Sequence, residues 1–362
     1  MSSTVIALDA FGGDHCPHAE VQGAVEAARA GVSVLLVGDR EPIAAALAKH
    51  DGAASLPISI HHAPERITME DHPGKAVRAK PDASMPTCFD LVRRGEAGAA
   101  MSAGNSGAML ACGLFKYRRI RGVDRPAIVT SLPNRTGFTA VLDVGANVDC
   151  KPVNFVQFAI MGAAYARFKT GRPRPRVGVL SNGSEDGKGT ELTRAVHEVL
   201  SASQSAEFLY AGYAEGEGFF DGHFDVIVTD GFTGNVALKV AEATGRLIGH
   251  WLRTAVTADL RSKLGALLLQ PAFAKLRENM NPDTYGAAPL LGVDGPAWIC
   301  HGGASPFAIA TALRLAARSV DEGLVGALTE ALSSNAGLVV AAKAHGVAAP
   351  TKTKTETEQP GS

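Results

Sequence analysis

Short apolar segments, rich in Val, Ile and Leu, alternate along this chain with longer segments of helical character. The apolar segments predict strands over 4–10, 33–39, 57–63, 127–133, 138–145, 176–183 and 224–231. The predicted helices between and after them cover 18–30, 41–49, 153–170, 188–202 and 234–256. Because repeated strand–helix units place their strands in parallel, the pattern predicts an α/β fold, a largely parallel sheet flanked by helices.

Most of the predicted strands end in Asp or Asn followed by Gly and Ser. The carboxyl ends of parallel strands meet at one edge of a sheet, where ligands bind in open α/β folds. Glycine lets backbone N–H groups approach a ligand closely, and the following helix points its positive end at the same place. These turns therefore predict a pocket lined by backbone donors, which suits an anion and most simply phosphate.

Three of the polar turns carry side chains suited to that task. In "SAGNSGA" (102–108), the polar side chains either cap a helix or contact a bound oxygen. In "NGSEDGKG" (182–189), the glycine spacing excludes a nucleotide P-loop, and Lys188 either binds an anion or is a solvated surface lysine. In "DGFTGNVALK" (230–239), Lys239 shares a helix face with Asn235, although a plain turn is the alternative.

Other motifs narrow the chemistry. "DAFGGDH" (9–15) lacks the dinucleotide fingerprint G-x-G-x-x-G, and no G-x-S-x-G serine-hydrolase elbow occurs. In "HGGASPFA" (301–308), Ser305 precedes a proline at a helix start, and His301 is either catalytic or holds a turn. We expect no metal site, because neither the histidines nor the five scattered cysteines show ligand spacing, and we expect no cofactor.

The net charge of −1 argues against a nucleic-acid partner bound by bulk attraction. A cytoplasmic location is expected, because the cysteines are unpaired in sequence and the N-terminus lacks signal-peptide features. No apolar run approaches the ~18 residues of a membrane span.

Two segments indicate surfaces. "KYRRIRGVDR" (116–125) is locally basic and predicts docking of an acidic protein. Segment 260–280 combines Leu264, Leu267, Leu268 and Phe273 with basic residues, and Pro271 splits it into two short helices. That pattern favours a helical hairpin on an anionic membrane surface, with a dimer interface or a hairpin packed on the core as the alternatives.

Taken together, the motifs resemble the bacterial phosphate acyltransferase family, the acyl-acyl-carrier-protein:phosphate acyltransferases of phospholipid synthesis. The matching stretches run in order from residue 7 to 305 and are "ALDAFGGDHCP", "ITMEDHPGKAVRAKPDASM", "SAGNSGAMLA", "DVGANVDCKP", "DVIVTDGFTGNVALK" and "YGAAPLLGVDGPAWICHGGAS". The chain departs from the family pattern at Ser181–Gly183 and at Gly286–Pro289. The resemblance implies a Rossmann-like fold akin to isopropylmalate dehydrogenase and phosphotransacetylase, a homodimer and peripheral membrane association.

The implied reaction moves a fatty acyl group from acyl carrier protein to inorganic phosphate, and a downstream glycerol-3-phosphate acyltransferase uses the acyl phosphate. We assign contact with phosphate or the oxyanion to Asn105, Ser106, Lys188 and Asn235. The expected substrate-binding residues are Asp9, Gly12, Gly13, Asp14, Asp71, Arg78, Lys80, Gly104, Gly107, Asp143, Asn147, Gly183, Asp230, Gly231, Gly234, Lys239, His301 and Ser305. The expected carrier-docking residues are Lys116, Arg118, Arg119 and Arg121.

Two other functions remain open on the sequence: a nicotinamide-dependent hydroxy-acid oxidoreductase on the same fold, and a non-enzymatic membrane-associated scaffold. For the domain organisation we expect a single two-lobed α/β catalytic domain over 1–345, with a protruding helical hairpin at about 257–285. The tail 346–362 has no bulky apolar residue after Val347, so we expect disorder there.

Overall fold

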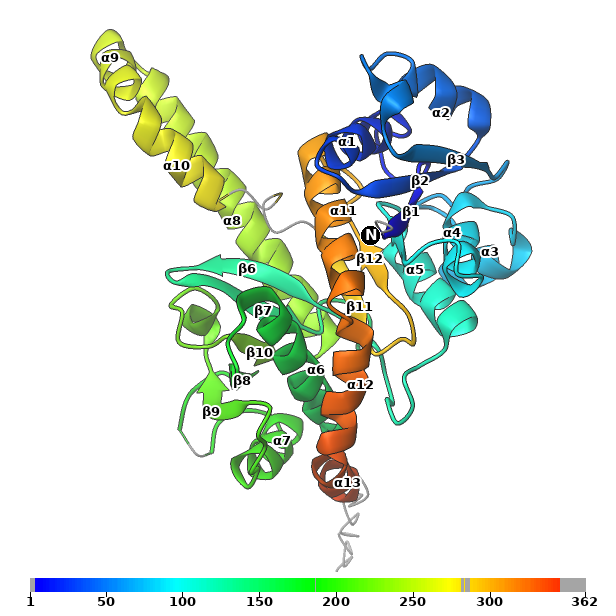
Figure 1. Ribbon diagram of the computed structural model, residues 1–362. Helices are drawn as coiled ribbons and strands as arrows, with labels where there is room; N and C mark the ends of the chain where they lie inside the picture. Colours follow the sequence, from blue (N-terminus) through cyan, green and yellow to red (C-terminus); the bar gives the residue numbers. More distant parts are fainter. Residues whose placement is uncertain (1–3, 186, 281–282, 284–286, 346–362) are drawn as a thin grey trace, which may run out of the picture.

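A computed structural model describes residues 4–185, 187–280, 283 and 287–345. The expected tail 346–362 lies outside the described residues. The strands form two sheets, each covered by helices (Figure 1). We call each sheet with its helices a lobe, the first lobe holding the N-terminal strand and the second lobe the middle of the chain. The predicted α/β architecture is confirmed, and it is distributed over these two sheets.

The first sheet has seven strands in the order β3-β2-β1-β4-β12-β11-β5. They are β1 (Val5–Asp9), β2 (Ser33–Gly38), β3 (Ile58–His62), β4 (Ala99–Ser102), β5 (Ala127–Ile128), β11 (Ala288–Leu291) and β12 (Ala297–Ile299). All neighbours pair in parallel except β11, which runs antiparallel to both β12 and β5. The parallel strands β1, β4 and β12 therefore bring their carboxyl ends to one edge.

The second sheet has five strands in the order β6-β7-β10-β8-β9. They are β6 (Thr130–Asn134), β7 (Gly137–Leu142), β8 (Arg176–Leu180), β9 (Leu209–Ala214) and β10 (Val226–Val228). Strand β6 is antiparallel to β7, and the others pair in parallel. The turns after β7, β8 and β10 consequently share an edge.

Helices cover both sheets. In the first lobe they are α1 (His18–Arg29), α2 (Arg40–Leu47), α3 (Pro73–Ala79), α4 (Ser84–Arg93), α5 (Ser106–Cys112), with the π-helical η2 (Gly113–Tyr117), and α11 (Pro306–Asp321). In the second lobe they are α6 (Pro152–Thr170), α7 (Glu191–Ser201), α12 (Leu324–Ser334) and α13 (Ala336–His345). Short 3₁₀ turns lie at η1 (Ala53–Ser55) and η3 (Gly216–Phe219).

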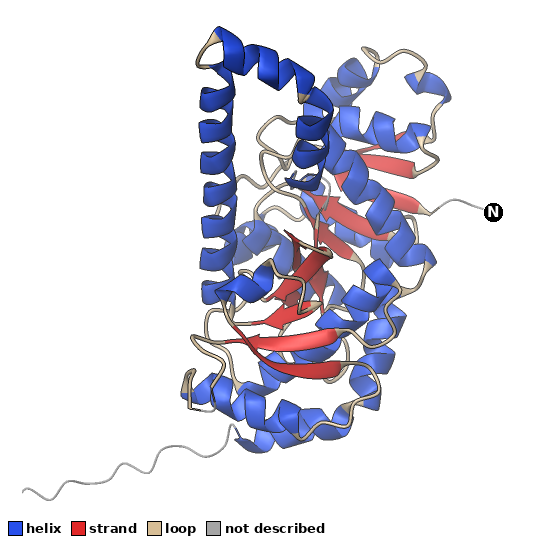
Figure 2. Cartoon of the chain, turned by 90° about the vertical axis from the view of Figure 1, so that its left-hand side faces the viewer, coloured by secondary structure: helices blue, strands red, loops and turns tan. Residues whose placement is uncertain are grey.

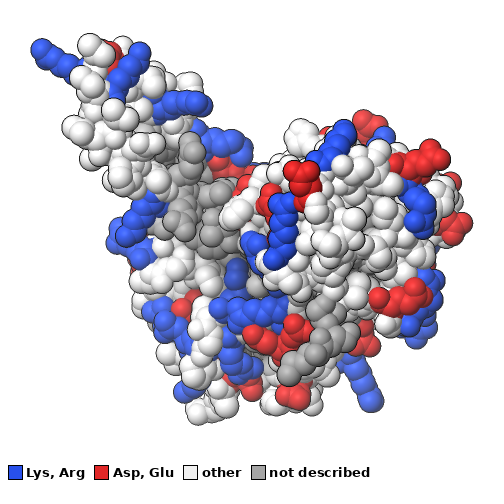
Figure 3. Space-filling view, turned by 45° about the horizontal axis from the view of Figure 1, so that its top comes forward, with Lys and Arg blue, Asp and Glu red and all other residues white. Residues whose placement is uncertain are grey.

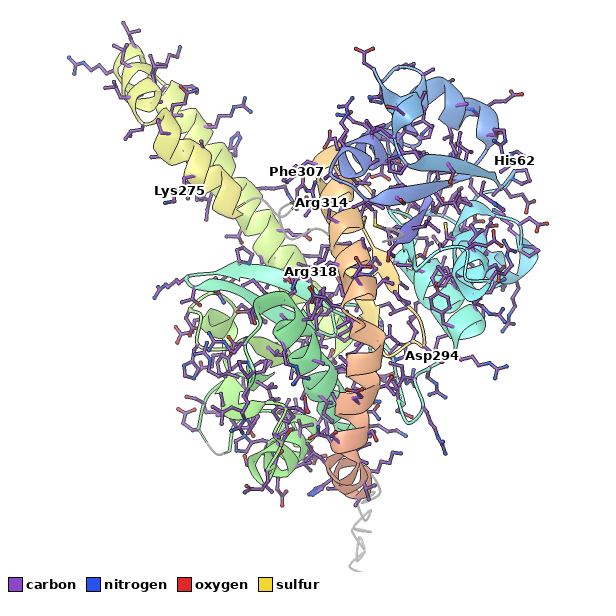
Figure 4. The ribbon with its side chains drawn as sticks, in the orientation of Figure 1. His62, Lys275, Asp294, Phe307, Arg314 and Arg318 are labelled. Atoms are coloured by element: carbon purple, nitrogen blue, oxygen red, sulfur yellow. The ribbon has the colours of Figure 1, made fainter. Side chains whose placement is uncertain are left out.

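Helix α6 is the central helix of the second lobe. Every residue from Pro152 to Ala166 is buried, because sheet strands and the C-terminal helices α12 and α13 pack around it. Helix α11 leaves the first lobe and leads directly into those helices. There Arg318 donates to the carbonyl oxygen of Phe168 at 2.7 Å, and its guanidinium lies 4.7 Å from the Phe168 ring centroid (Figure 4). The C-terminal helices thus tie the two lobes together.

The expected hairpin is longer than 257–285. Its outgoing part is α8 (Gly231–Thr257), and the chain returns through α9 (Leu260–Leu268) and α10 (Gln270–Met280). We call α8, α9 and α10 the arm. Pro271 stands in the first turn of α10, where a missing N–H is tolerated. Figure 2 shows α9 crossing the end of the arm between α8 and α10.

The arm exposes much apolar surface. Leu264, Leu267 and Leu268 are 56%, 64% and 83% exposed, whereas Phe273 is half-buried. On α8 the exposed apolar side chains include Phe232, Val236, Val240, Leu247 and Trp251, and the helix buries only Gly231 and Gly234. Figure 3 shows Lys and Arg side chains among the uncharged surface of the arm.

Among the described residues, no single helix is long and apolar enough to cross a membrane. One bent pair, α12 with α13, passes by length and composition alone. Its inner face packs on α6, so core burial explains its apolar character.

Candidate active site between the lobes

The turn after β1 is built on a buried carboxylate. Asp9 is 1% exposed, accepts the N–H of Phe11 at 3.1 Å, and accepts the hydroxyl of Ser102 at 2.7 Å. Ser102 in turn accepts the N–H of Gly104 at 2.9 Å. Burial raises the pKa of the Asp9 carboxyl, and these donors oppose the shift. The strand ends of β1 and β4 are therefore fastened to each other.

Glycines 12 and 13 complete this turn. A Cβ on Gly12 would lie 2.5 Å from the Ser102 hydroxyl, so only glycine fits. The N–H of Gly13 donates to Glu20, which is 1% exposed and whose pKa burial raises to about 7. Asp14 is exposed, and its N–H donates to the carbonyl of Gly302. Three carboxyl groups and occupied amides make this corner a poor place for a further anion.

Asn105 has a structural role. Its side-chain oxygen caps α5 by accepting the N–H of Ala108, and its amide nitrogen donates to the carbonyls of Thr68 and Asp71. Ser106 is exposed at the same helix start. A Cβ on Gly107 would lie 2.7 Å from Pro73, so the 68–73 loop packs on this turn. Asn105 therefore positions the loop, and the neighbouring Ser106 is the more open of the two.

The segment around α3 is held by pairs. Lys80 donates to Asp71 at 2.7 Å, and the Thr68 N–H donates to the same carboxylate. These two hydrogen bonds lower the pKa of Asp71. The Arg78 guanidinium lies 4.8 Å from the ring centroid of Phe115. The three expected substrate-binding residues of this segment thus have partners within the protein.

Asp143 organises the turn after β7. Its carboxylate accepts backbone N–H groups of Ile128, Ala146 and Asn147 at 3.0, 3.1 and 2.6 Å, and the Asn147 side-chain amide at 2.9 Å. Burial raises the pKa of Asp143, and these donors oppose the shift. Since Ile128 lies in β5 of the first sheet, this carboxylate also joins the two lobes.

The turn after β10 packs directly on Asp143. Asp230 caps α8 by accepting the N–H of Thr233 at 2.8 Å. The N–H of Gly231 donates to the carbonyl of Asn147, and a Cβ on Gly234 would overlap the backbone carbonyl of Asp143. The two glycines therefore permit the close approach of α8 to the β7 turn.

Asn235 and Lys188 both belong to this edge of the second sheet. Asn235 is exposed on the first turn of α8, and its amide faces Gly145. Lys188 is exposed in the loop after β8, where the Gly189 N–H donates to Asn182 and a Cβ on Gly183 would meet the Lys188 side chain. Because β8 and β10 are parallel neighbours, the two candidates share a strand edge. Asn105 belongs to the other lobe.

A cavity of about 500 Å³ opens at the junction of the lobes. From the first lobe it is lined by Leu110 of α5 and Leu114, and from the second by Ala146, Asn147 and Asn154. Its charged lining consists of Arg119, Asp124, Arg125, Asp149 and Lys151. The cavity therefore joins the helix that Asn105 caps to the turn that Asp143 holds. Sequence reasoning assigned Asn147 to the site but missed Arg125 and Lys151.

Cys150 follows the Asp143 turn and precedes Lys151 of the cavity lining. Burial and the charges of Asp143 and Asp230 raise the pKa of the Cys150 thiol to about 12, whereas Arg125 lowers it. The Asn147 side-chain amide donates to the carbonyl of Pro126 at 2.7 Å, which places the neighbouring Arg125 beside the Asp143 turn.

The remaining candidates have more local contacts. His301 is exposed and accepts the N–H of Gly303, while Ser305 caps α11 and donates to Asp283 at 2.5 Å. Lys239 pairs with Glu242 on α8. These four contacts shape turns and helix surfaces, and His301, Ser305 and Lys239 do not line the inter-lobe cavity.

Solved structures with a similar fold define the class. A phosphotransacetylase from Staphylococcus aureus aligns with a TM-score of 0.56 at 16% identity, covering 88% of this chain and 94% of that one. A phosphotransacetylase from Streptococcus pyogenes gives 0.58 at 15% identity, with the same two coverages. The fold is thus that of the phosphotransacetylases.

Sequence relatives carry the assignment further. The "Fatty acid synthesis protein" family model matches residues 4–326. Phosphate acyltransferases from Geobacter sulfurreducens and Syntrophotalea carbinolica are 48% and 49% identical, covering 91% and 88% of this chain and 94% and 91% of theirs. The chain belongs to the phosphate acyltransferase family and is an acyltransferase of fatty acid and phospholipid synthesis. This assignment favours neither an oxidoreductase nor a scaffold.

Proposed function

We propose that this enzyme transfers a fatty acyl group from the thioester of acyl carrier protein to inorganic phosphate. The product is an acyl phosphate, which a glycerol-3-phosphate acyltransferase consumes. The observation that carries the proposal is the inter-lobe cavity, whose charged lining is three cationic and two anionic side chains and which the Asp143 turn borders, in a chain whose relatives are named phosphate acyltransferases.

The chemistry requires little from the protein beyond placement. A phosphate oxygen attacks the thioester carbonyl carbon, the carbon–sulfur bond breaks, and the carrier's thiolate leaves. Phosphate is partly dianionic near neutral pH and a thiolate leaves readily, so neither a strong base nor a strong acid is needed. The protein must hold phosphate in line with the carbonyl and stabilise the oxyanion. We assign the latter task to Lys188 and Asn235, which stand exposed at the second lobe's edge.

Replacing Lys188 or Asn235 by alanine is expected to lower turnover by roughly 10²-fold, the effect of losing one oxyanion donor. The measurement is phosphate-dependent thiol release from acyl carrier protein. Lys49→Ala, an exposed lysine after α2, is the control and should behave as wild type. Wild-type rates in both folded variants would refute these roles, and thiol release independent of phosphate would refute the proposed reaction.

We propose that acyl carrier protein docks on the basic segment 116–125, mainly through those of its cationic side chains that have no partner among the described residues. Lys116 is paired with Asp90 at 2.6 Å and Arg119 donates to the Asp124 carbonyl, whereas Arg118 and Arg121 are exposed. Reversing both exposed charges, Arg118→Glu with Arg121→Glu, should raise KM for acyl carrier protein and spare acyl-coenzyme A. An equal loss on both donors would contradict docking.

We propose that the arm meets an anionic membrane surface at its tip and a second copy of the chain along α8, giving a peripheral cytoplasmic homodimer. The support is the series of exposed apolar side chains along α8 and α9, which no other described part of the chain covers. Leu268→Asp is expected to reduce flotation with anionic liposomes several-fold, since a charge replaces an 83% exposed leucine. Val340→Asp on α13 is the matched control. Unchanged flotation of Leu268→Asp would eliminate the tip as the contact, and sedimentation of a monomer would eliminate the dimer.

A further inference from the structure

The inter-lobe cavity contains charged side chains suited to binding an anion, which the polar strand-end turns of the first lobe do not offer. Of its charged lining, Arg119, Arg125 and Lys151 are cationic, and Asp124 and Asp149 are anionic. The Asp124 carboxylate already accepts the side-chain amide of Asn154 at 2.8 Å. Arg119 is likewise engaged, because it donates to the Asp124 backbone carbonyl. Two cations of the cavity lining, Arg125 and Lys151, therefore remain available to bind an anion.

Arg125 and Lys151 are those two cations. Across the residues that the structure describes, neither forms an ion pair with a carboxylate. Both are exposed and line the cavity, Arg125 from the loop before β5 and Lys151 from the loop between β7 and α6. Lys151 is also the N-cap of α6, so the positive end of a 19-residue helix faces the same space. An oxyanion there would meet a guanidinium, an ammonium and a helix N-terminus.

The first-lobe corner offers the opposite environment. There the backbone N–H groups of Gly13, Gly104 and Asp14 already donate hydrogen bonds, to the Glu20 carboxyl, the Ser102 hydroxyl and the Gly302 carbonyl, respectively. Asp9, Asp14 and Glu20 bring carboxyl groups to that turn. A phosphate dianion would therefore meet carboxyl groups and occupied amides at this corner, and unpaired cations at the inter-lobe cavity.

We propose that Arg125 and Lys151 bind the phosphate that the enzyme acylates, holding its oxyanion in the inter-lobe cavity beside Asn147. The role of this phosphate as acyl acceptor rests on the proposed function, whereas binding of the anion by the two cations does not depend on it. Arg125 contributes a planar pair of donors, and Lys151 contributes a point charge. The phosphodiester of the carrier's thiol arm shares this chemistry and is the competing occupant that the experiment must separate.

The experiment compares Arg125→Ala, Lys151→Ala and Arg125→Lys with wild type and Lys49→Ala. Calorimetric titration with inorganic phosphate, at constant ionic strength and without acyl donor, measures binding directly. We expect each alanine variant to weaken binding about tenfold or more, the scale of one charge-assisted hydrogen bond, and Arg125→Lys to recover part of it. Lys49→Ala should bind as wild type. Wild-type affinity in both alanine variants overturns the proposal.

Kinetics separate the two occupants. With an acyl-pantetheine thioester, which lacks the phosphodiester, KM for phosphate should rise about tenfold in both alanine variants while KM for the donor stays constant. An increase confined to KM for acyl carrier protein, with phosphate binding intact, overturns the proposal in favour of the phosphodiester. If wild type binds phosphate through these residues yet releases no thiol, the phosphate site stands and the proposed function fails.

Discussion

The Gly234→Ala variant is expected to lose about 3 kcal/mol or more of its free energy of unfolding. The new methyl group would overlap the backbone carbonyl oxygen of Asp143, and it would also meet the Thr229 side chain. A backbone carbonyl that ends a packed strand cannot rotate away as a flexible side chain does. Helix α8 must then shift, and the turn that holds Asn147 shifts with it. Urea denaturation measures the loss, and thiol release measures the accompanying fall in turnover.

Gly245→Ala is a closely matched control because it lies in the same helix. A Cβ at Gly245 meets no atom within 4 Å. There alanine should stabilise the protein by up to about 1 kcal/mol, because it is the better helix former. If both variants unfold at the same urea concentration, close approach at Gly234 is not what fixes α8 to the β7 turn.

Asp143→Ala is expected to destabilise the protein by more than about 3 kcal/mol. The substitution removes one acceptor but leaves the N–H groups of Ile128, Ala146 and Asn147 pointing at it, together with the Asn147 amide. Each buried donor without a partner costs roughly 1–3 kcal/mol, and the costs are not additive. Because Ile128 belongs to the first sheet, the two lobes should also separate more easily. Denaturant unfolding and susceptibility to proteolysis measure these effects.

Two comparisons make that result specific. Asp143→Asn keeps one oxygen acceptor and should lie between wild type and the alanine variant. Asp51→Ala removes an exposed carboxylate and should change stability by less than about 0.5 kcal/mol. An Asp143→Ala protein as stable as Asp51→Ala would show that water replaces the carboxylate at no cost.

The sequence predicted those strands whose apolar side chains dominate their composition. β1, β2, β8 and β10 all lie inside the predicted intervals because Val, Ile and Leu fill them. β4, by contrast, is Ala99–Ser102, a four-residue strand made of two alanines, a methionine and a serine. Its buried position comes from pairing between β1 and β12, so no local pattern reveals it. Helices α12 and α13 were not predicted, although the buried Leu324, Leu328 and Leu332 of α12 follow helical spacing.

Part of the candidate site could likewise be predicted from the sequence, and part could not. The polar turns were predictable because an acceptor and a small residue follow a strand that ends at a packed corner, as at the buried Asp143 and the partly exposed Asp230. The cavity was not predictable, since Arg125 and Lys151 come together only when the connection before β5 meets the turn after β7. Sequence reasoning assigned Arg125 to a basic docking segment. Similarly, the pairing of Lys116 with Asp90 spans 26 residues and leaves no trace in the local charge pattern.

The order of strands in the first sheet affects how the chain is made. β12 sits between β4 and β11, and β11 links it to β5, so four neighbouring strands come from sequence segments separated by all five strands of the second sheet. All five strands of the second sheet leave the ribosome before Ala288 does. The second sheet, which begins later, is therefore completed first, while β4 waits with its β12 edge unpaired, so that edge is where a nascent chain is prone to aggregate.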